Sequence, residues 1–415
     1  MKHLIGAALA TCLLALAALP AAAQEGALRL TAQTGKVQRQ YGFHVALDPA
    51  STRAKDYTYE LLEGESVIAS REHVADTLCF LPIADVDAVN PGRYTVRVTA
   101  YPSGERAGFD RAGSASTEVS AVGGCSCAAA DRFQLGSGTE EDPYLVGTLG
   151  QLLHVNQHSS KKTYYMQTAD IAFGNYTYSQ QKNQEIILSG GSVYDGNGHV
   201  IRDGSVRCTA ANSSAAVFGV KGSTLRNLGF EELSFFGTNG AGPVSADSTS
   251  VVEYCYGKNI DASANNHASP LVHWAEGRVE NCYTVGGQLT TTKDESYGAG
   301  GITGCMSYSS QIDKTYAMPA KLTSPKPAGI AAFVRSGTVG NSFYLQGVAA
   351  YGANPGNDNT NAAPLEARQF ADQSRFEAAG WDFENVWMMG EVSYTDASGN
   401  TVTVAAPVLR VFQGG

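Results

Sequence analysis

The chain has 415 residues, enough for two domains or one long solenoid, and it carries a formal net charge of −10. Glycine is abundant, with 46 residues, and charged residues make up only 16% of the chain, which is typical of a tightly turned β protein and excludes a disordered one. The negative charge argues against nucleic acid and anionic membrane surfaces as partners.

Residues 1–23 have the pattern of a secretory signal peptide. Lys2 gives a basic start, an apolar run covers residues 4–19, and three alanines at 21–23 form a small-residue cleavage site. We expect cleavage after Ala23; a lipoprotein signal at Cys12 is the alternative. Because no later stretch is long and apolar enough to span a bilayer, the mature protein is predicted to be secreted or displayed on a bacterial cell surface.

Residues 24–119 are predicted to form an immunoglobulin-like β-sandwich. Alternating apolar residues mark several short strands: Leu28 and Leu30; Phe43, Val45 and Leu47; Tyr57, Tyr59 and Leu61; Tyr94, Val96 and Val98. About seven such strands within about 100 residues fit this architecture. The stretch from the Asn-Pro-Gly turn at 90–92 to Glu105 resembles the later strands of immunoglobulin-like or fibronectin type III-like modules of bacterial surface proteins.

Residues 120–135 read as a linker that leads into a repetitive region at 136–363. The linker contains Cys125 and Cys127, and with Cys79 they leave the disulfide connectivity open, since seven cysteines remain after signal cleavage. Leu149, Leu152, Leu153 and Val155 predict a short amphipathic helix at 148–158. We expect this helix to cover the open first coil of a solenoid.

Two apolar columns recur between residues 217 and 343. The first column is Val217, Val244, Leu271, Ile302 and Ile330, with steps of 27, 27, 31 and 28 residues. The second column is Leu225, Val252, Val279, Ile312 and Val339. A fixed period in the twenties is typical of a solenoid, in which each unit buries its apolar face against its neighbours.

The repeat unit is predicted to be one coil of a right-handed parallel β-helix. Short alternating apolar runs are separated by Gly, Asn or Ser, and none has a helical period. Equivalent residues are then stacked about 4.8 Å apart, and the right hand follows from the rule for parallel crossovers. Cys255 and Cys282 share one repeat position and are interpreted as stacked buried thiols, with a disulfide between coils as the alternative.

Several segments resemble the GLUG-repeat surface proteins of bacteria. In chain order they are GSGTEEDPYL at 136–145, YYMQTADI at 164–171, YDGNGHVI at 194–201, AVFG at 216–219, LRNL at 225–228, VENCY at 279–283, FEAAGWDFENVW at 376–387 and PVLR at 407–410. The later coils at 244–246 and 330–332 lack the aromatic residue and the glycine of the signature. The resemblance implies a β-helix on a surface protein.

The same repeats occur in bacterial immunoglobulin A1 metalloproteases, whose activity requires a His-Glu-x-x-His motif. None of the eight histidines here belongs to one; His154 and His158 are four apart with no glutamate between them. The resemblance therefore carries over no catalytic residue, and we predict no metal site and no cofactor.

A polysaccharide lyase or glycoside hydrolase in the β-helix groove is the enzymatic alternative. Glu253 and Glu280 are one coil apart, as two catalytic carboxylates would require. They directly follow the inward Val252 and Val279, however, so we interpret them as part of a solvated ladder with Arg226 and Asp313.

Residues 364–415 are predicted to close the last coil. Five aromatic residues make this the densest aromatic cluster of the chain: Phe370, Phe376, Trp381, Phe383 and Trp387. We interpret them as a second cap packed over the last coil, with a ligand pocket as the alternative. The segment before it, at 352–363, reads as a loop.

The candidate binding site is a row of rings at one repeat position, Tyr256, Tyr283, Tyr316 and Phe343. If these rings face outward, they form a flat strip about 15 Å long at one ring per coil, suited to a sugar face or a partner protein. The long insertion at 287–299 would form one edge of a groove. The sequence thus favours a non-catalytic adhesin that binds a glycan or a host or matrix protein, with an aromatic ladder in a purely structural stalk as a further alternative.

Overall fold

The computed structural model describes residues 28–52, 54–83, 93–101, 113–120, 124–178, 186–247, 249–293, 297–308, 310–353 and 360–413. The predicted signal peptide, the predicted turn at 90–92, and parts of the predicted linker (121–123) and loop (354–359) lie outside these residues. The chain divides into two compact units, Met1–Leu145 and Val146–Gly415, which are described separately.

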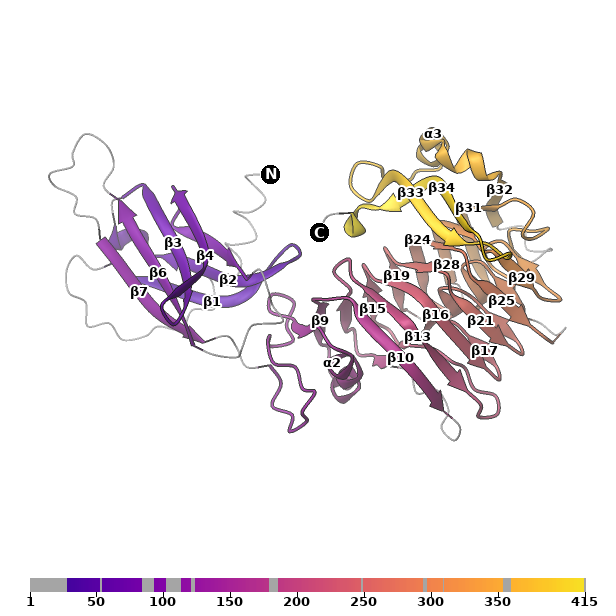
Figure 1. Ribbon diagram of the computed structural model, residues 1–415, viewed down its shortest axis with the longest axis horizontal. Coiled ribbons are helices and arrows are strands. Elements are labelled where there is room, and N and C mark those ends of the chain that lie inside the picture. The colour runs from indigo at the N-terminus through magenta and orange to yellow at the C-terminus, as the bar shows by residue number, and fades with distance from the viewer. Residues whose placement is uncertain are drawn as a thin grey trace. The chain divides into compact units, whose positions relative to one another are not determined.

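The described residues of the first unit form seven strands in two antiparallel sheets (Figure 1). One sheet has the order β1-β2-β5, with β1 at Leu30–Val37, β2 at Gln40–Leu47 and β5 at Leu78–Pro82. The other has the order β4-β3-β6-β7, with β3 at Asp56–Glu63, β4 at Ser66–Val74, β6 at Arg93–Tyr101 and β7 at Gly113–Ser120. A short 3-10 helix, η2, covers Pro49–Ser51.

The predicted alternation decides which side chains are buried in this unit. The buried residues include Phe43, Val45 and Leu47 of β2, Tyr57, Tyr59 and Leu61 of β3, and Tyr94, Val96 and Val98 of β6. Their intervening neighbours remain accessible: Arg97 of β6 donates from Nε to Glu60 Oε2 of β3 at 2.6 Å. The period of two therefore gives each of these sheets one apolar face.

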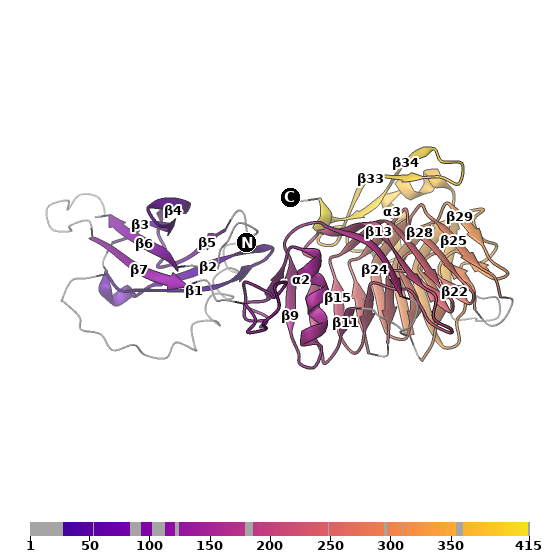
Figure 2. The ribbon, with the colours of Figure 1, turned by 60° about the horizontal axis from the view of Figure 1, so that its bottom comes forward.

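The second unit is a parallel β-solenoid of about six turns over residues 164–344, which confirms the predicted β-helix (Figures 1 and 2). Its 16-stranded sheet contains β8 (Tyr144–Val146), β9 (Tyr164–Gln167), β10 (Ile171–Tyr178), β12 (Val193–Asp195), β13 (Val200–Cys208), β15 (Thr224–Arg226), β16 (Gly229–Gly237), β19 (Val251–Glu253), β20 (Tyr256–Lys258), β21 (Asp261–Ala264), β24 (Arg278–Val285), β25 (Gln288–Thr291), β28 (Ser310–Met318), β29 (Lys321–Thr323), β31 (Gly337–Leu345) and β32 (Thr360–Leu365).

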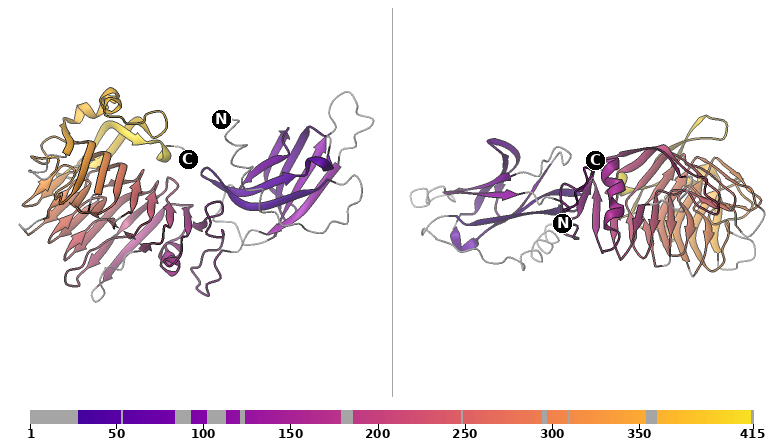
Figure 3. Two further views of the ribbon diagram at one scale, coloured as in Figure 1. Left: turned by 180° about the vertical axis from the view of Figure 1, so that it is seen from behind. Right: turned by 90° about the horizontal axis from the view of Figure 1, so that it is seen from below.

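Two smaller parallel sheets complete the coils. The five-stranded sheet has the order β11 (Ile186–Leu188), β14 (Phe218–Val220), β18 (Val244–Ala246), β23 (Val272–Ala275) and β27 (Thr303–Met306). The four-stranded sheet has the order β17 (Gly240–Ala241), β22 (His267–Ala268), β26 (Ala299–Gly300) and β30 (Pro327–Ala328). The right panel of Figure 3 shows the successive strands side by side along the solenoid.

Both predicted apolar columns fill the interior. The second column pairs directly from coil to coil: Leu225 with Val252, Val252 with Val279, Val279 with Ile312, and Ile312 with Val339. All five residues of each column are at most 1% exposed. Cys255 and Cys282 are buried, reduced thiols, and the Cys255 backbone N–H lies 3.4 Å from Cys282 Sγ. The prediction of stacked thiols is therefore confirmed, and the alternative disulfide is wrong.

The residue two positions after each member of the second apolar column adopts a left-handed conformation. These residues are Asn227, Tyr254, Asn281, Lys314 and Asn341, with φ between 44° and 54°. Asparagine tolerates this region better than other non-glycine residues, and it turns the chain between the two inward-facing residues. Three of five coils use it here.

Replacing Lys314 by Asn is expected to give a free energy of unfolding about 0.5–1 kcal/mol higher than replacing it by Ala, because asparagine suits the left-handed corner better than other non-glycine residues. The substitution removes the ion pair between Lys314 Nζ and Asp313 Oδ2, which being on the surface contributes at most about 1 kcal/mol. Urea denaturation of the mature protein measures the change. Lys314→Ala is the control, since it removes the same ion pair without the backbone preference, and equal stability of the two variants would contradict the explanation.

The predicted helix at 148–158 is present as α2 (Leu149–His154) followed by the 3-10 helix η4 (Val155–His158). The Thr148 side chain caps it by accepting from the Gln151 backbone N–H. Within the second unit, η4 contacts β11 and α2 contacts β10, and Asn156 Oδ1 accepts from the Ile187 backbone N–H at 2.7 Å. The helix thus packs on the first coil.

The C-terminal segment differs from its predicted place. After β32 come η5 (Ala367–Ala371), α3 (Gln373–Ala378), the antiparallel hairpin of β33 (Trp387–Thr395) and β34 (Thr401–Leu409), and η6 (Arg410–Phe412). We expected the segment over the end of the last coil. Strand β32 does pair with β31 in the last coil, but the hairpin packs along the flank of several coils, against residues from Tyr256 to Phe343 (Figure 2).

Candidate functional site

The four predicted binding residues form the predicted ladder, but it is not exposed. The rings of Tyr256 and Tyr283 are stacked with centroids 5.0 Å apart, and those of Tyr283 and Tyr316 likewise. Phe343, one coil after Tyr316, pairs with it in register. Their residual exposures of 7%, 6%, 0% and 8% show that the predicted open strip is wrong.

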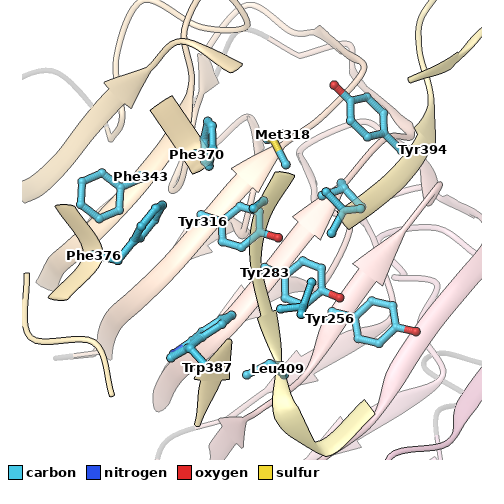
Figure 4. Close-up of a cluster of buried hydrophobic side chains, with 14 of the residues drawn as sticks. Tyr256, Tyr283, Tyr316, Met318, Phe343, Phe370, Phe376, Trp387, Tyr394 and Leu409 are labelled. Atoms are coloured by element: carbon cyan, nitrogen blue, oxygen red, sulfur yellow. The ribbon is translucent and has the colours of Figure 1, made fainter. Parts of the chain in front are cut away.

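The C-terminal segment is what covers the ladder (Figure 4). Phe412 lies edge-on to Tyr256 at 4.7 Å, and Phe376 lies edge-on to Phe343 at 5.0 Å. The Tyr316 hydroxyl donates to the Pro407 carbonyl at 2.9 Å. These rings are therefore the packing face for this segment, and a glycan cannot reach them while the segment is in place.

The two glutamates weighed as catalytic candidates lie in the predicted charged column. Glu253 pairs in register with Arg226 below and Glu280 above. Arg278 bridges the carboxylates, from Nη1 to Glu280 Oε1 at 2.5 Å and from Nη2 to Glu253 Oε2 at 3.5 Å. Burial raises the pKa of Glu253, while Arg278 lowers it. The pair is thus more buried than a solvated ladder, and its charges are compensated by arginine.

An open hollow lies on a different face, over the five-stranded sheet. It has a cavity volume of about 230 Å³ and is lined by Gly219, Val220, Lys221, Ser245, Asp247, Trp274 and Glu276. Gly219 pairs with Ser245, and Ser245 pairs with Trp274, on three successive coils. Two small residues therefore form a floor beside the large, half-buried indole. A concave site with convergent polar groups beside an aromatic ring is a candidate for ligand binding.

A β-bulge positions Trp274. The pairing of β18 with β23 shifts between Val244 and Ser245, so that His273 is the extra residue of β23. His273 and Val272 are both buried, whereas Trp274 is half-buried and lines the hollow. Bulges re-aim side chains in this way beside functional sites.

Trp274 begins a row of rings that crosses successive coils. Tyr297, in the long insertion predicted to form a groove edge, lies 6.0 Å from Trp274 and 5.2 Å from Phe333 between ring centroids. All three rings are half-buried. The structure therefore has a partly exposed aromatic row, but on a different face from the predicted one.

The corner residues that follow these strands supply the charges. Lys221, Asp247, Glu276, Ser307 and Arg335 each donate their backbone N–H to the preceding coil at an equivalent corner, at 2.7–3.0 Å. Asp247 and Glu276 thus follow each other at the coil spacing of about 4.8 Å. Glu276 Oε1 also accepts from the Trp274 indole N–H at 2.9 Å. The hollow combines an aromatic wall, two carboxylates and one ammonium group.

This arrangement suits hydroxyl-rich rings. An indole face packs against the C–H face of a sugar, and carboxylates accept hydrogen bonds from its hydroxyl groups. The sequence period does not align the charged residues of this hollow, because they lie at different distances from the first apolar column. Asp247 is three residues after Val244, whereas Glu276 is five residues after Leu271. The signal was the recurrence of charged residues just behind that column, which the bulge shifts out of phase.

Comparison with known proteins gives no match: no family model, no curated protein and no solved structure is similar to this chain. Within the described part of the chain, the helices are all too short or too polar to cross a bilayer.

Proposed function

We propose that this is a secreted or cell-surface protein without catalytic activity, whose β-solenoid binds a glycan in the hollow beside Trp274. The observation that carries the proposal is the half-buried indole standing over a floor of Gly219 and Ser245 with Asp247 and Glu276 at the rim. The signal-like N-terminus and the resemblance to GLUG-repeat surface proteins support the location. We infer that the first unit is an immunoglobulin-like sandwich and that the solenoid is right-handed, with α2 and η4 as the cap of its first coil.

The accessible row favours a glycan over a protein partner. Trp274, Tyr297 and Phe333 follow the solenoid axis at a spacing set by the coils, which suits an extended chain of similar units. The hollow has a volume of about 230 Å³, room for several water molecules. That room fits one ring-sized group, and a standard protein interface needs a much larger surface.

Replacing Trp274 by Ala is expected to weaken glycan retention at least about tenfold, because an indole at the centre of such a site contributes about 2 kcal/mol, and about 1.4 kcal/mol corresponds to tenfold. The measurement is a glycan array with the mature protein, followed by titration of each retained glycan. Tyr351→Ala is the matched control, since Tyr351 is a 52% exposed ring on the same solenoid that does not line the hollow. Equal retention by wild type and Trp274→Ala would overturn the proposal.

A polysaccharide-active enzyme is the second candidate, and the pair of Asp247 and Glu276 on successive coils favours it. Two carboxylates about one coil apart are within the range that retaining glycosidases use. Product analysis of each retained glycan separates the two functions. Depolymerisation that is lost in Glu276→Gln would identify an enzyme, whereas binding without products supports the adhesin.

A further inference from the structure

Two histidines are buried directly behind the aromatic row. The rings of His267 and His273 are stacked, with centroids 5.1 Å apart and an interplanar angle of 16°, and their Nδ1 atoms are 3.2 Å apart. Each is 1% exposed. The Nε2 atom of each ring is buried without a hydrogen-bond partner among the described residues. A solenoid interior usually holds apolar side chains. Two buried imidazoles, each with one ring nitrogen that lacks a hydrogen bond, therefore require an explanation.

The pair touches the candidate site. The His267 ring lies 5.4 Å from Trp274 and 5.6 Å from Tyr297 between centroids. His273 is the bulge residue that precedes Trp274 in β23. Any displacement of these imidazoles therefore acts on two of the three rings of the row.

Among the residues that the structure describes, no carboxylate contacts either imidazole. On the β17 side the pair faces Gly240, where an added Cβ would lie 2.1 Å from His267 Cε1, and on the β27 side it faces Gly304. Of the titratable groups, Tyr297 contacts His267 directly, and its pKa is raised by burial. Cys305 of β27 pairs in register with Trp274, and its pKa is also raised by burial. Glu276 is linked to the pair through the Trp274 indole.

Burial lowers the pKa of His267 to about 4, and burial together with its partner lowers the pKa of His273. Both imidazoles are therefore neutral near neutral pH in the arrangement that the structure shows, which we call closed. Their contribution to the closed state is complete above the unperturbed pKa of 6.5 and is lost as the pH falls from there towards about 4. An open arrangement that hydrates the His267 ring and restores its ordinary pKa gains roughly fortyfold over the closed one between pH 6.5 and about pH 4.5, and protonation of His273 acts in the same direction.

We propose that the His267–His273 pair is an acid-sensitive switch that releases the glycan from the Trp274 site when the pH falls. Protonation places a positive charge behind the row, the imidazoles move towards water, and Trp274 and Tyr297 lose their positions. The inference rests on the proposed function for its biological consequence, but the switch itself can be measured without any ligand.

The test follows Trp274 by ¹⁹F NMR in the full mature chain labelled with 5-fluorotryptophan. The chain contains three tryptophans, and single Trp→Phe variants assign their resonances. From about pH 7.5 to about pH 4.5, we expect the Trp274 resonance to shift with a midpoint between about 4 and 6.5, while Trp381 and Trp387 stay unchanged. The double variant His267→Phe with His273→Phe, which keeps two aromatic rings that cannot titrate, should abolish the shift. His199→Gln, an imidazole elsewhere in the solenoid, should preserve it.

Three results would overturn the switch: a Trp274 resonance that does not change with pH, a change common to all three tryptophans, or a change that persists in the double variant. If the phenylalanine pair does not fold, His267→Gln with His273→Gln takes its place. The proposed function is judged separately by the array at neutral pH. Retained glycans should dissociate at least about tenfold more readily at about pH 4.5 than at about pH 7, and Trp274-dependent retention without that pH effect refutes the switch alone.

Discussion

Replacing Trp387 by Ala is expected to lower the free energy of unfolding of the solenoid unit by about 3–5 kcal/mol. Trp387 is fully buried at the start of the C-terminal hairpin. Its ring packs 4.5 Å from Trp381 and 6.2 Å from Tyr283 between centroids, and its indole N–H donates to Asn281 Oδ1 at 3.1 Å. The substitution removes the largest fully buried side chain among the described residues and leaves the amide of a left-handed corner without its donor.

The loss should fall on the C-terminal segment first. Urea denaturation measures the stability, and limited proteolysis reports whether residues 360–413 become cleavable before the coils do. Trp387→Phe is the control, because it keeps most of the apolar area and loses the hydrogen bond, and it should cost less than half as much. If Trp387→Ala left both the stability and the cleavage pattern unchanged, the segment would not be held by this aromatic cluster.

The coil geometry could be predicted because it is local and repeated. An inward valine or leucine recurs at one position in every coil, and the stacking of Leu225, Val252 and Val279 follows from that period alone. The left-handed corners leave only a partial signal in the sequence, because three of the five carry asparagine and the other two carry Tyr254 and Lys314. Each of these features needs only the neighbouring coil, so a single period contains the information.

The fate of the ladder could not be predicted because it depends on a distant segment. Tyr283 and Trp387 are more than a hundred residues apart, and nothing in the repeat says that a later hairpin will lie on that flank. The cluster of aromatic residues at 370–387 is consistent with a segment that packs on the last coil and equally with one that packs on the flank of the solenoid. Outward-facing rings were correctly assigned to one repeat position, but their exposure was a tertiary property.

The site beside Trp274 escaped prediction for the opposite reason, since it arises where the repeat breaks. One extra residue in β23 turns His273 inward, and the insertion before β26 supplies Tyr297. Period-based reasoning treats such departures as noise. In a solenoid, whose regular coils only fill their own interior, departures are where a site can form.

Replacing Val252 by Asp is expected to destabilise the solenoid by at least about 4 kcal/mol and to abolish its cooperative unfolding. Val252 is fully buried between Leu225 and Val279. An isolated carboxyl group in such a place stays protonated, because burial raises its pKa by about 3–5 units. Each unit corresponds to about 1.36 kcal/mol of lost stability at a pH where the unfolded chain is ionised. The lost valine packing adds to this.

The same substitution one residue earlier is the control. Val251 is half-buried on the opposite side of β19, so Val251→Asp keeps its carboxylate in water and should cost about 1 kcal/mol or less. Circular dichroism with urea denaturation at neutral pH compares the two variants. The two variants differ only in whether the new side chain points inward or outward. Equal destabilisation would mean that side chains of β19 do not alternate between the buried interior and solvent. A larger effect at Val251 would reverse the assignment of the two faces.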